Sequence, residues 1–355
     1  MKNRNLFLVV VLFGVILVLV GILTFKIYKD KISFFEFYEN NGKKIVGSDS
    51  KEEDGEVSNE SVREKINIFN GNDRPIAVMI DNHSGAWPQA GLNKAYLVYE
   101  IVVEGGETRL MALFKGVSVD KIGPVRSSRH YFLDYAMENG AIYVHYGWSP
   151  QAEADIGTYR VQNINGITQS SSDFWRVKDK SSPHNVFTST TKILEMAESK
   201  GYSVKSNDKS VFKYTANEAR LENAISATQV TIPHSNLQTV EYVYDAQKKV
   251  YTRFARGKKQ TDYETKEDLV TKNIIVEFVD NYTLEDPENK GRQGLNNVGT
   301  FDGYYVTDGK AMKIKCIKSS RMAKTVYKDL NGVELEINDG NTWVQICPKD
   351  AQVKF

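Results

Sequence analysis

A run of twenty residues without a charged side chain near the start of the chain constrains the fold more than any other feature. Residues 6–25 read LFLVVVLFGVILVLVGILTF. A helix of this length, at about 1.5 Å per residue, spans roughly 30 Å, which is the thickness of the hydrocarbon layer of a membrane. Basic residues lie on both sides of the run, at Lys2, Arg4, Lys26, Lys29 and Lys31. We therefore expect residues 1–30 to form a membrane anchor.

Two other interpretations of this run are weaker. A cleaved signal peptide has an apolar region of about 7–15 residues and a small-residue cleavage site, whereas Thr24, Phe25 and Lys26 follow one another here. A buried core helix would have to be apolar all round at the extreme terminus. With only five residues before the run, we expect a single-pass protein of the cell membrane whose soluble domains lie on the extracytoplasmic side.

Composition excludes several classes of protein. The 355 residues suggest two domains, and 46 Lys and Arg against 45 Asp and Glu give a net charge of +1. Nucleic-acid binders normally carry a basic excess, so we expect no nucleic-acid partner. Cys316 and Cys347 are the two cysteines, which excludes a small disulfide-stapled scaffold.

The order of apolar segments predicts the organisation of the soluble part. We expect residues 31–69 to be a tether, because residues 47–61 contain one apolar side chain, Val57. A domain of α/β type is expected at 70–204. Its predicted strands are residues 75–81, 95–104, 108–116 and 141–149, and its predicted helices are residues 126–140, capped by Ser127 or Ser128, and 190–201.

Short alternating segments follow and predict a β-rich, antiparallel domain at 205–355. Asp308-Gly309 and Asn331-Gly332 are strong hairpin signals. The two cysteines fall on predicted strands, where each fits a small core residue better than half of a disulfide. The expected class is α+β: a membrane helix, an α/β-type domain and a β-rich C-terminal domain.

The segment EIVVEGGETRLM, residues 100–111, predicts a polar hairpin. If Gly105-Gly106 is a two-residue turn, Val102 lies opposite Arg109, and Glu104 lies opposite Glu107. Strand alternation then places Glu100, Glu104, Glu107 and Arg109 on one face, with Arg109 within reach of Glu104.

This face has two interpretations. Crowded carboxylates raise one another's pKa, so Glu104 or Glu100 could act as a general acid or base. Alternatively, the face is solvated and an Arg109–Glu104 bridge contributes little. Glu100 and Glu104 are about 13 Å apart along one strand, too far for a two-carboxylate glycosidase. A mechanism with one glutamic acid, as in lytic transglycosylases, fits better.

The segment GPVRSSR, residues 123–129, is a candidate anion site. Arg126 and Arg129 flank Ser127 at a predicted helix start, where free N–H groups favour a carboxylate or a phosphate. The alternative is a serine cap with both arginines paired to the acidic face of the hairpin.

Four further residues are candidates for substrate binding. Asp81 and Asn82 end a buried strand, where ligand crevices often lie, and His145 and Trp148 come from the segment HYGWSP. The alternatives are that Asp81 and Asn82 only cap a turn and that Trp148 belongs to the core. The five histidines show no metal-binding spacing and there is no glycine-rich phosphate loop, so we expect no metal and no cofactor.

These segments resemble the YerB-like lipoproteins of Gram-positive bacteria, a domain family of unknown function. The most specific matches are EGGETR and GPVRSSR, and the resemblance extends over about residues 70–350. Members are typically lipid-anchored at the outer face of the membrane, which implies the same location here. No cysteine follows the apolar run, so the expected anchor is the helix itself.

Location and chemistry together give two functional hypotheses. The first is a peptidoglycan-processing enzyme of lytic-transglycosylase type, with Glu104 as the acid and Arg109 and Arg126 as substrate-binding groups. The second is a non-catalytic envelope module that binds cell-wall glycan or a partner protein through the same face.

Overall fold

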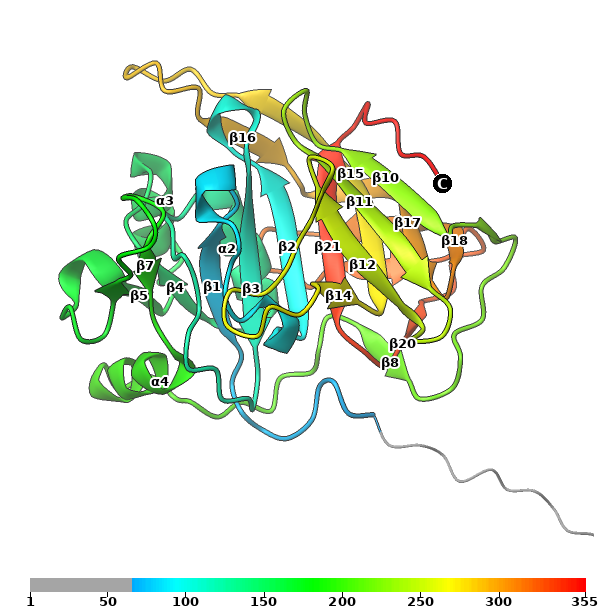
Figure 1. Cartoon of the computed structure of the whole chain (residues 1–355). Helices are drawn as coiled ribbons and strands as arrows, with labels where there is room; N and C mark the ends of the chain where they lie inside the picture. Colours follow the sequence, from blue (N-terminus) through cyan, green and yellow to red (C-terminus); the bar gives the residue numbers. More distant parts are fainter. Residues whose placement is uncertain (1–65) are drawn as a thin grey trace, which may run out of the picture. The chain divides into compact units, whose positions relative to one another are not determined.

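The structure, a computed structural model, describes residues 66–355. Strands predominate in this part of the chain and helices are few (Figure 1), which confirms the α+β class. The expected membrane helix at residues 6–25 lies outside the described residues, as does most of the expected tether. Within residues 66–355, no helix combines the length and the apolar composition that a membrane crossing requires.

A mixed sheet of twelve strands is the largest element. Its order is β19-β18-β17-β15-β21-β2-β3-β1-β4-β5, with β16 paired to β15 and β9 paired to β18. The strands are β1 (Ile76–Asp81), β2 (Leu97–Val102), β3 (Thr108–Phe114), β4 (Ile142–His145), β5 (Asn163–Asn165), β9 (Ile225–Ser226), β15 (Asn273–Thr283), β16 (Gln293–Asn296), β17 (Gly299–Thr307), β18 (Lys310–Lys318), β19 (Val326–Lys328) and β21 (Thr342–Pro348).

A second sheet of five strands packs on the main sheet. It comprises β10 (Gln229–Pro233), β11 (Thr239–Asp245), β12 (Val250–Ala255), β13 (Lys258–Lys259) and β14 (Val270–Thr271). Tyr242 and Tyr251 of this sheet share a core with Ile274, Val276 and Cys347 of the main sheet. Two small sheets complete the fold, one pairing β8 (Lys213–Thr215) with β20 (Glu336–Asn338) and the other pairing β6 (Trp175–Arg176) with β7 (Val186–Phe187).

Helices cover both faces of the main sheet, α2 (His130–Glu138) and α3 (Pro150–Thr158) on one and α4 (Thr190–Ser199) on the other. Phe132 of α2 packs in the same core as Met79 of β1, whereas Ile193 of α4 packs in the core that holds Val78. Neighbouring residues of β1 therefore enter different cores, which explains why this strand is apolar almost throughout.

The two segments expected to be separate domains share the main sheet. β21, near the C-terminus, lies between β15 and β2 and runs parallel to both, with Val344 opposite Tyr99 of β2. The C-terminal segment therefore contains parallel pairs as well as the expected antiparallel ones. The hairpin expected at Asp308-Gly309 is confirmed, as the connection between β17 and β18. Cys316 and Cys347 are buried and free, as core residues.

Candidate functional site

The β2–β3 hairpin differs from the sequence prediction by one residue of register. Glu104, Gly105 and Gly106 all lie in the turn, and the Val103 N–H donates to the Glu107 carbonyl at 2.8 Å. Both glycines have positive φ, 68° and 74°, which lets the chain reverse in three residues. The predicted two-residue turn was therefore wrong.

This shift changes the face on which the polar residues lie. Arg109 pairs with Ile101 instead of Val102, and Glu100 pairs with Leu110. Because side chains alternate along a strand, Glu100 and Arg109 lie on opposite faces of the sheet. The expected cluster of three carboxylates and one arginine on a single face does not form.

Glu100 lies in the interior, under the second sheet. Its carboxylate forms an ion pair with Arg253 of β12 at 3.0 Å, and both side chains are almost completely buried. Asn82 donates to Glu100 at 3.0 Å and to Thr108 at 2.7 Å, so this candidate binding residue belongs to the same interior network. Arg253 also stacks on the ring of Trp343, 4.6 Å from its centroid.

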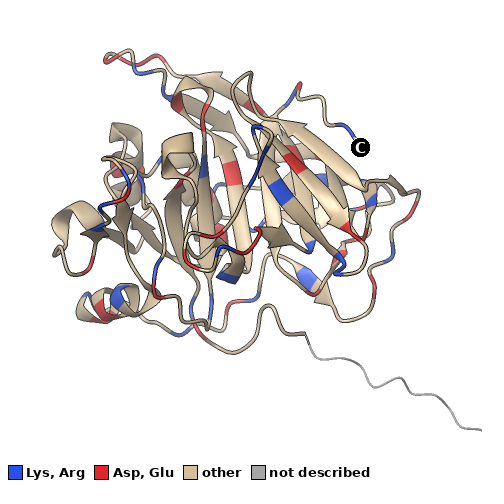
Figure 2. Cartoon of the chain, viewed as in Figure 1, with Lys and Arg blue, Asp and Glu red and all other residues tan. Residues whose placement is uncertain are grey.

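This environment keeps Glu100 ionised. Burial raises the pKa of its carboxyl, but the charges of Arg253 and His234 and hydrogen bonds from Thr108 and Arg253 outweigh burial, so the pKa lies below its ordinary value. Charged residues of the strands are coloured in Figure 2, and within residues 66–355 Glu100–Arg253 and Lys318–Glu138 are the ion pairs whose side chains are both at most 2% exposed. Glu100 is a structural ion pair and does not line the pocket described next.

A pocket of about 440 Å³ lies on the other side of the hairpin turn. Five arginine or lysine side chains line it against three carboxylates, so positive charge is in excess. The lining residues are Asp81, His83, Val103, Glu104, Glu107, Thr108, Arg109, Arg126, Ser127, Arg129, Trp148, Ser149, His184, Lys290 and Arg292. Of the candidate site residues, Glu104, Arg109, Arg126, Arg129, Ser127, Asp81 and Trp148 meet here.

Arg129 and Glu104 form one wall. The guanidinium donates to both carboxylate oxygens, at 2.5 and 2.8 Å. Burial raises the pKa of the Glu104 carboxyl, but the hydrogen bond and charge of Arg129, together with the charge of Arg109, leave the pKa below its ordinary value. The expected serine cap is wrong, since α2 begins after Arg129 and no side chain caps it.

Asp81 organises the opposite wall. Its Oδ2 lies 3.0 Å from Arg126 Nε and 2.7 Å from His184 Nδ1, and its Oδ1 accepts from the backbone N–H of His83. The alternative in which Arg126 pairs with the acidic face of the hairpin therefore does not hold, because its partner is Asp81. The ring of His184 stacks on His83 with centroids 4.5 Å apart.

Arg109 is a pocket cation without a close ion-pair partner among residues 66–355. Only 6% of the residue is exposed, and its Nη1 donates to the Ser127 carbonyl at 2.7 Å. Among residues 66–355, no carboxylate lies within 4.0 Å of its guanidinium, so the expected bridge to Glu104 is absent. Burial and the charges of Arg129 and Arg126 lower the pKa of Arg109 to about 10, although the charges of Asp81 and Glu104 oppose this shift.

His145 does not reach the pocket. It is completely buried, its ring bonds to the Gly147 carbonyl at 2.8 Å and to Asn163 Oδ1 at 3.1 Å, and burial lowers its pKa. These contacts identify a core histidine, so the prediction that His145 binds substrate is wrong. Trp148, three residues on, does line the pocket.

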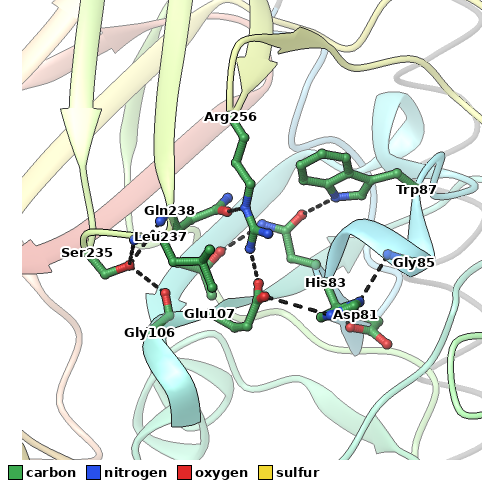
Figure 3. A network of polar contacts seen from close by, with 12 residues as sticks. Asp81, His83, Gly85, Trp87, Gly106, Glu107, Ser235, Leu237, Gln238 and Arg256 are labelled. Atoms are coloured by element: carbon green, nitrogen blue, oxygen red, sulfur yellow. Dashed lines mark hydrogen bonds and ion pairs between the residues drawn. The ribbon is translucent and has the colours of Figure 1, made fainter.

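The second sheet holds the hairpin turn from above. Arg256 forms an ion pair with Glu107 and donates to Gln238 at 2.7 Å, and Ser235 donates to the Gly106 carbonyl at 2.5 Å (Figure 3). Glu104 and Glu107 therefore each have their own arginine, so no ligand is required between them.

The sequence prediction missed several of these residues. His184, Lys290 and Arg292 line the pocket, Arg253 pairs with Glu100, and Arg256 pairs with Glu107. His184 lies in the segment PHNVFT, residues 183–188, within the stretch of the chain that resembles the YerB-like family. The partners of the others lie far away in the sequence.

Comparison with known proteins gives consistent matches over most of the chain. The family "Protein of unknown function (DUF3048) N-terminal domain" matches residues 63–203, and its C-terminal counterpart matches residues 230–344. "Putative lipoprotein YerB" of Bacillus subtilis (strain 168) is 31% identical over 284 residues, which are 78% of this chain and 81% of the relative. A crystal structure of YerB from Bacillus subtilis matches with a TM-score of 0.71, covering 80% of this chain and 94% of that chain.

Proposed function

Because this chain belongs to the DUF3048 family and is similar to YerB, a protein named as a lipoprotein, we propose that it is a membrane-associated protein of the cell envelope. The uncharged run at residues 6–25 supports attachment through a helix. In cell fractionation, we expect the full-length chain in the membrane fraction. A shortened chain in the culture medium would show instead that the run is a cleaved signal.

The function that the pocket supports best is the binding of an anionic group, either a carboxylate or a phosphate, on a cell-wall glycan. The observation that carries this proposal is Arg109, which is buried at the pocket without a carboxylate partner among residues 66–355. The charges of Asp81 and Glu104 offset the burial of this guanidinium only in part, so burying it costs stability. An arginine at this position is understandable if a bound ligand supplies additional negative charge.

The glycan-cleaving alternative has less support. A catalytic acid must be protonated near neutral pH, and such acids have a raised pKa. The pKa of Glu104 is lowered because Arg129 holds both of its oxygens. Glu107 is paired with Arg256. Neither carboxylate is in the environment that acid catalysis requires.

Cosedimentation with cell-wall sacculi tests the proposal. The full-length chain in detergent should sediment with purified sacculi, Arg109→Met should remain in the supernatant, and inorganic phosphate should compete with the wild type. Arg220→Met is the matched control, because Arg220 is largely exposed and lies outside the pocket. Equal sedimentation of Arg109→Met and wild type would contradict the proposal, and release of soluble muropeptides would revive the cleavage hypothesis.

A further inference from the structure

Two stacked histidines at the pocket wall hold complementary tautomers. A carboxylate can only accept, so the 2.7 Å contact between Asp81 Oδ2 and His184 Nδ1 places the proton on Nδ1. With Nδ1 as the donor, the lone pair of the imidazole ring lies on Nε2. His83 is the reverse: its Nδ1 accepts from the Gly85 N–H at 3.0 Å, so its proton lies on Nε2.

His184 therefore has the arrangement of a general base. Asp81 is buried and holds the ring in one orientation, and Arg126 lies 3.0 Å from the same carboxylate oxygen. Such a carboxylate–histidine pair directs an imidazole lone pair toward a proton to be removed. The structural alternative is that the pair only fixes the loop that carries His184.

The cations beside this base limit the substrate class. Arg109 and Arg126 line the same pocket as His184, and Arg109 is not neutralised by any carboxylate within 4.0 Å among residues 66–355. A glycosidic bond is neutral and needs a protonated acid, which the pocket does not offer. A phosphodiester is already anionic, and its hydrolysis needs a base for water and cations to stabilise the charge on the phosphoryl oxygens.

We propose that this pocket hydrolyses a phosphodiester, with His184 as the general base, Asp81 as its positioning residue and Arg109 as the cation that binds the phosphoryl group. This inference rests on the proposed anion binding at the same pocket. His184 Nε2 takes a proton from water as the water oxygen bonds to phosphorus. The ester P–O bond breaks, and the proton passes to the leaving alkoxide. One diester and one water thus give one phosphate monoester and one alcohol.

Bis(4-nitrophenyl) phosphate is a suitable probe, because its hydrolysis releases coloured 4-nitrophenolate. The full-length wild-type chain in detergent should release it, and His184→Gln should lower kcat by about 100-fold or more, the usual contribution of a general base. Asp81→Asn should also lower kcat without weakening the binding of inorganic phosphate, which a merely structural role would weaken. His130→Gln is the matched control, since His130 does not line the pocket.

The outcomes separate this inference from the proposed function. Undiminished release by His184→Gln would overturn the inference. So would a wild type that binds inorganic phosphate but releases no nitrophenolate, while the binding function would stand. A wild type that does not bind phosphate at all would overturn both.

Discussion

The Arg253 guanidinium lies 3.0 Å from the Glu100 carboxylate, and the two residues join β12 of the second sheet to β2 of the main sheet. Both are buried, so this pair crosses the interface between the sheets without access to solvent. The pair explains why a central strand can contain a buried glutamate, and it indicates that Glu100 stabilises the fold.

Removing one member of this pair should be strongly destabilising. Glu100→Gln leaves the Arg253 charge buried without its partner, which typically costs about 3–5 kcal/mol. Denaturant unfolding measures the loss. Glu336→Gln is the control, because it breaks an exposed pair with Lys213 and should leave the free energy of unfolding close to the wild-type value. Equal effects of the two substitutions would contradict the structural role of Glu100.

Glu277 should make stability depend on pH. Burial and the charge of Glu138 raise the pKa of its carboxyl from 4.5 to about 8, although Lys318 lowers it, and neither oxygen has a hydrogen-bond partner among residues 66–355. Between these two values the folded chain keeps a proton that the unfolded chain has released. Stability from this group is therefore greatest below pH 4.5 and falls as the pH rises toward 8.

The neutral variant Glu277→Gln isolates this effect. It should raise the free energy of unfolding at neutral pH by a few kcal/mol and flatten its dependence between about pH 5 and pH 8. The measurement is denaturant unfolding of both proteins across that range, and the difference between them removes the contribution of other titrating groups. Parallel curves would show that Glu277 is ionised in the folded chain.

Glu104→Gln should increase the affinity of the pocket for inorganic phosphate. The substitution removes a negative charge from the wall and weakens the hold on Arg129, whose guanidinium then has donors free for the ligand. Calorimetric titration measures the change, with Glu198→Gln on the exposed side of α4 as the control. Unchanged or weaker phosphate binding by Glu104→Gln would contradict this prediction. Loss of a muropeptide-releasing activity that the wild type possesses would identify Glu104 as a catalytic acid.

The elements whose signals are local could be predicted from the sequence. β1, β2 and β3 could be predicted because strands buried on both faces of a sheet have nearly continuous apolar sequences. The hairpin at Asp308-Gly309 could be predicted because that dipeptide accommodates positive φ. α4 begins after Ser189, whose side chain accepts from the Lys192 N–H, and such a cap is visible in the sequence.

The register of the β2–β3 hairpin could not be fixed in the same way. A two-residue and a three-residue turn both suit Gly105-Gly106, and the choice depends on contacts from elsewhere, such as Ser235 on the Gly106 carbonyl. A shift of one residue moved Arg109 to the face opposite Glu100. Arg129 contacts Glu104 on the acidic face of the hairpin, as the alternative interpretation held, whereas Arg126 pairs with Asp81 and Arg109 lacks the expected bridge to Glu104.

The partners themselves come from distant parts of the chain. His184 bonds to Asp81 across 103 positions, and the Arg256–Glu107 contact spans 149. A single sequence carries no periodicity or spacing that links such positions. Arg109, Arg126 and Arg129 could be identified from the sequence. Which of them has no carboxylate within ion-pair distance depends on the fold.

Titration of inorganic phosphate into the full-length chain, followed by calorimetry, tests the central claim that Arg109 is held free for an anion. The wild type should bind, and Arg109→Met should bind about tenfold more weakly or worse, since a hydrogen bond to a charged group contributes roughly 1.5–3 kcal/mol. The Tm of Arg109→Met without phosphate should be no lower than that of the wild type, because the substitution removes a buried charge that Asp81 and Glu104 offset only in part. Unchanged phosphate affinity in Arg109→Met, or a lowered Tm accompanying the loss of binding, would contradict the account.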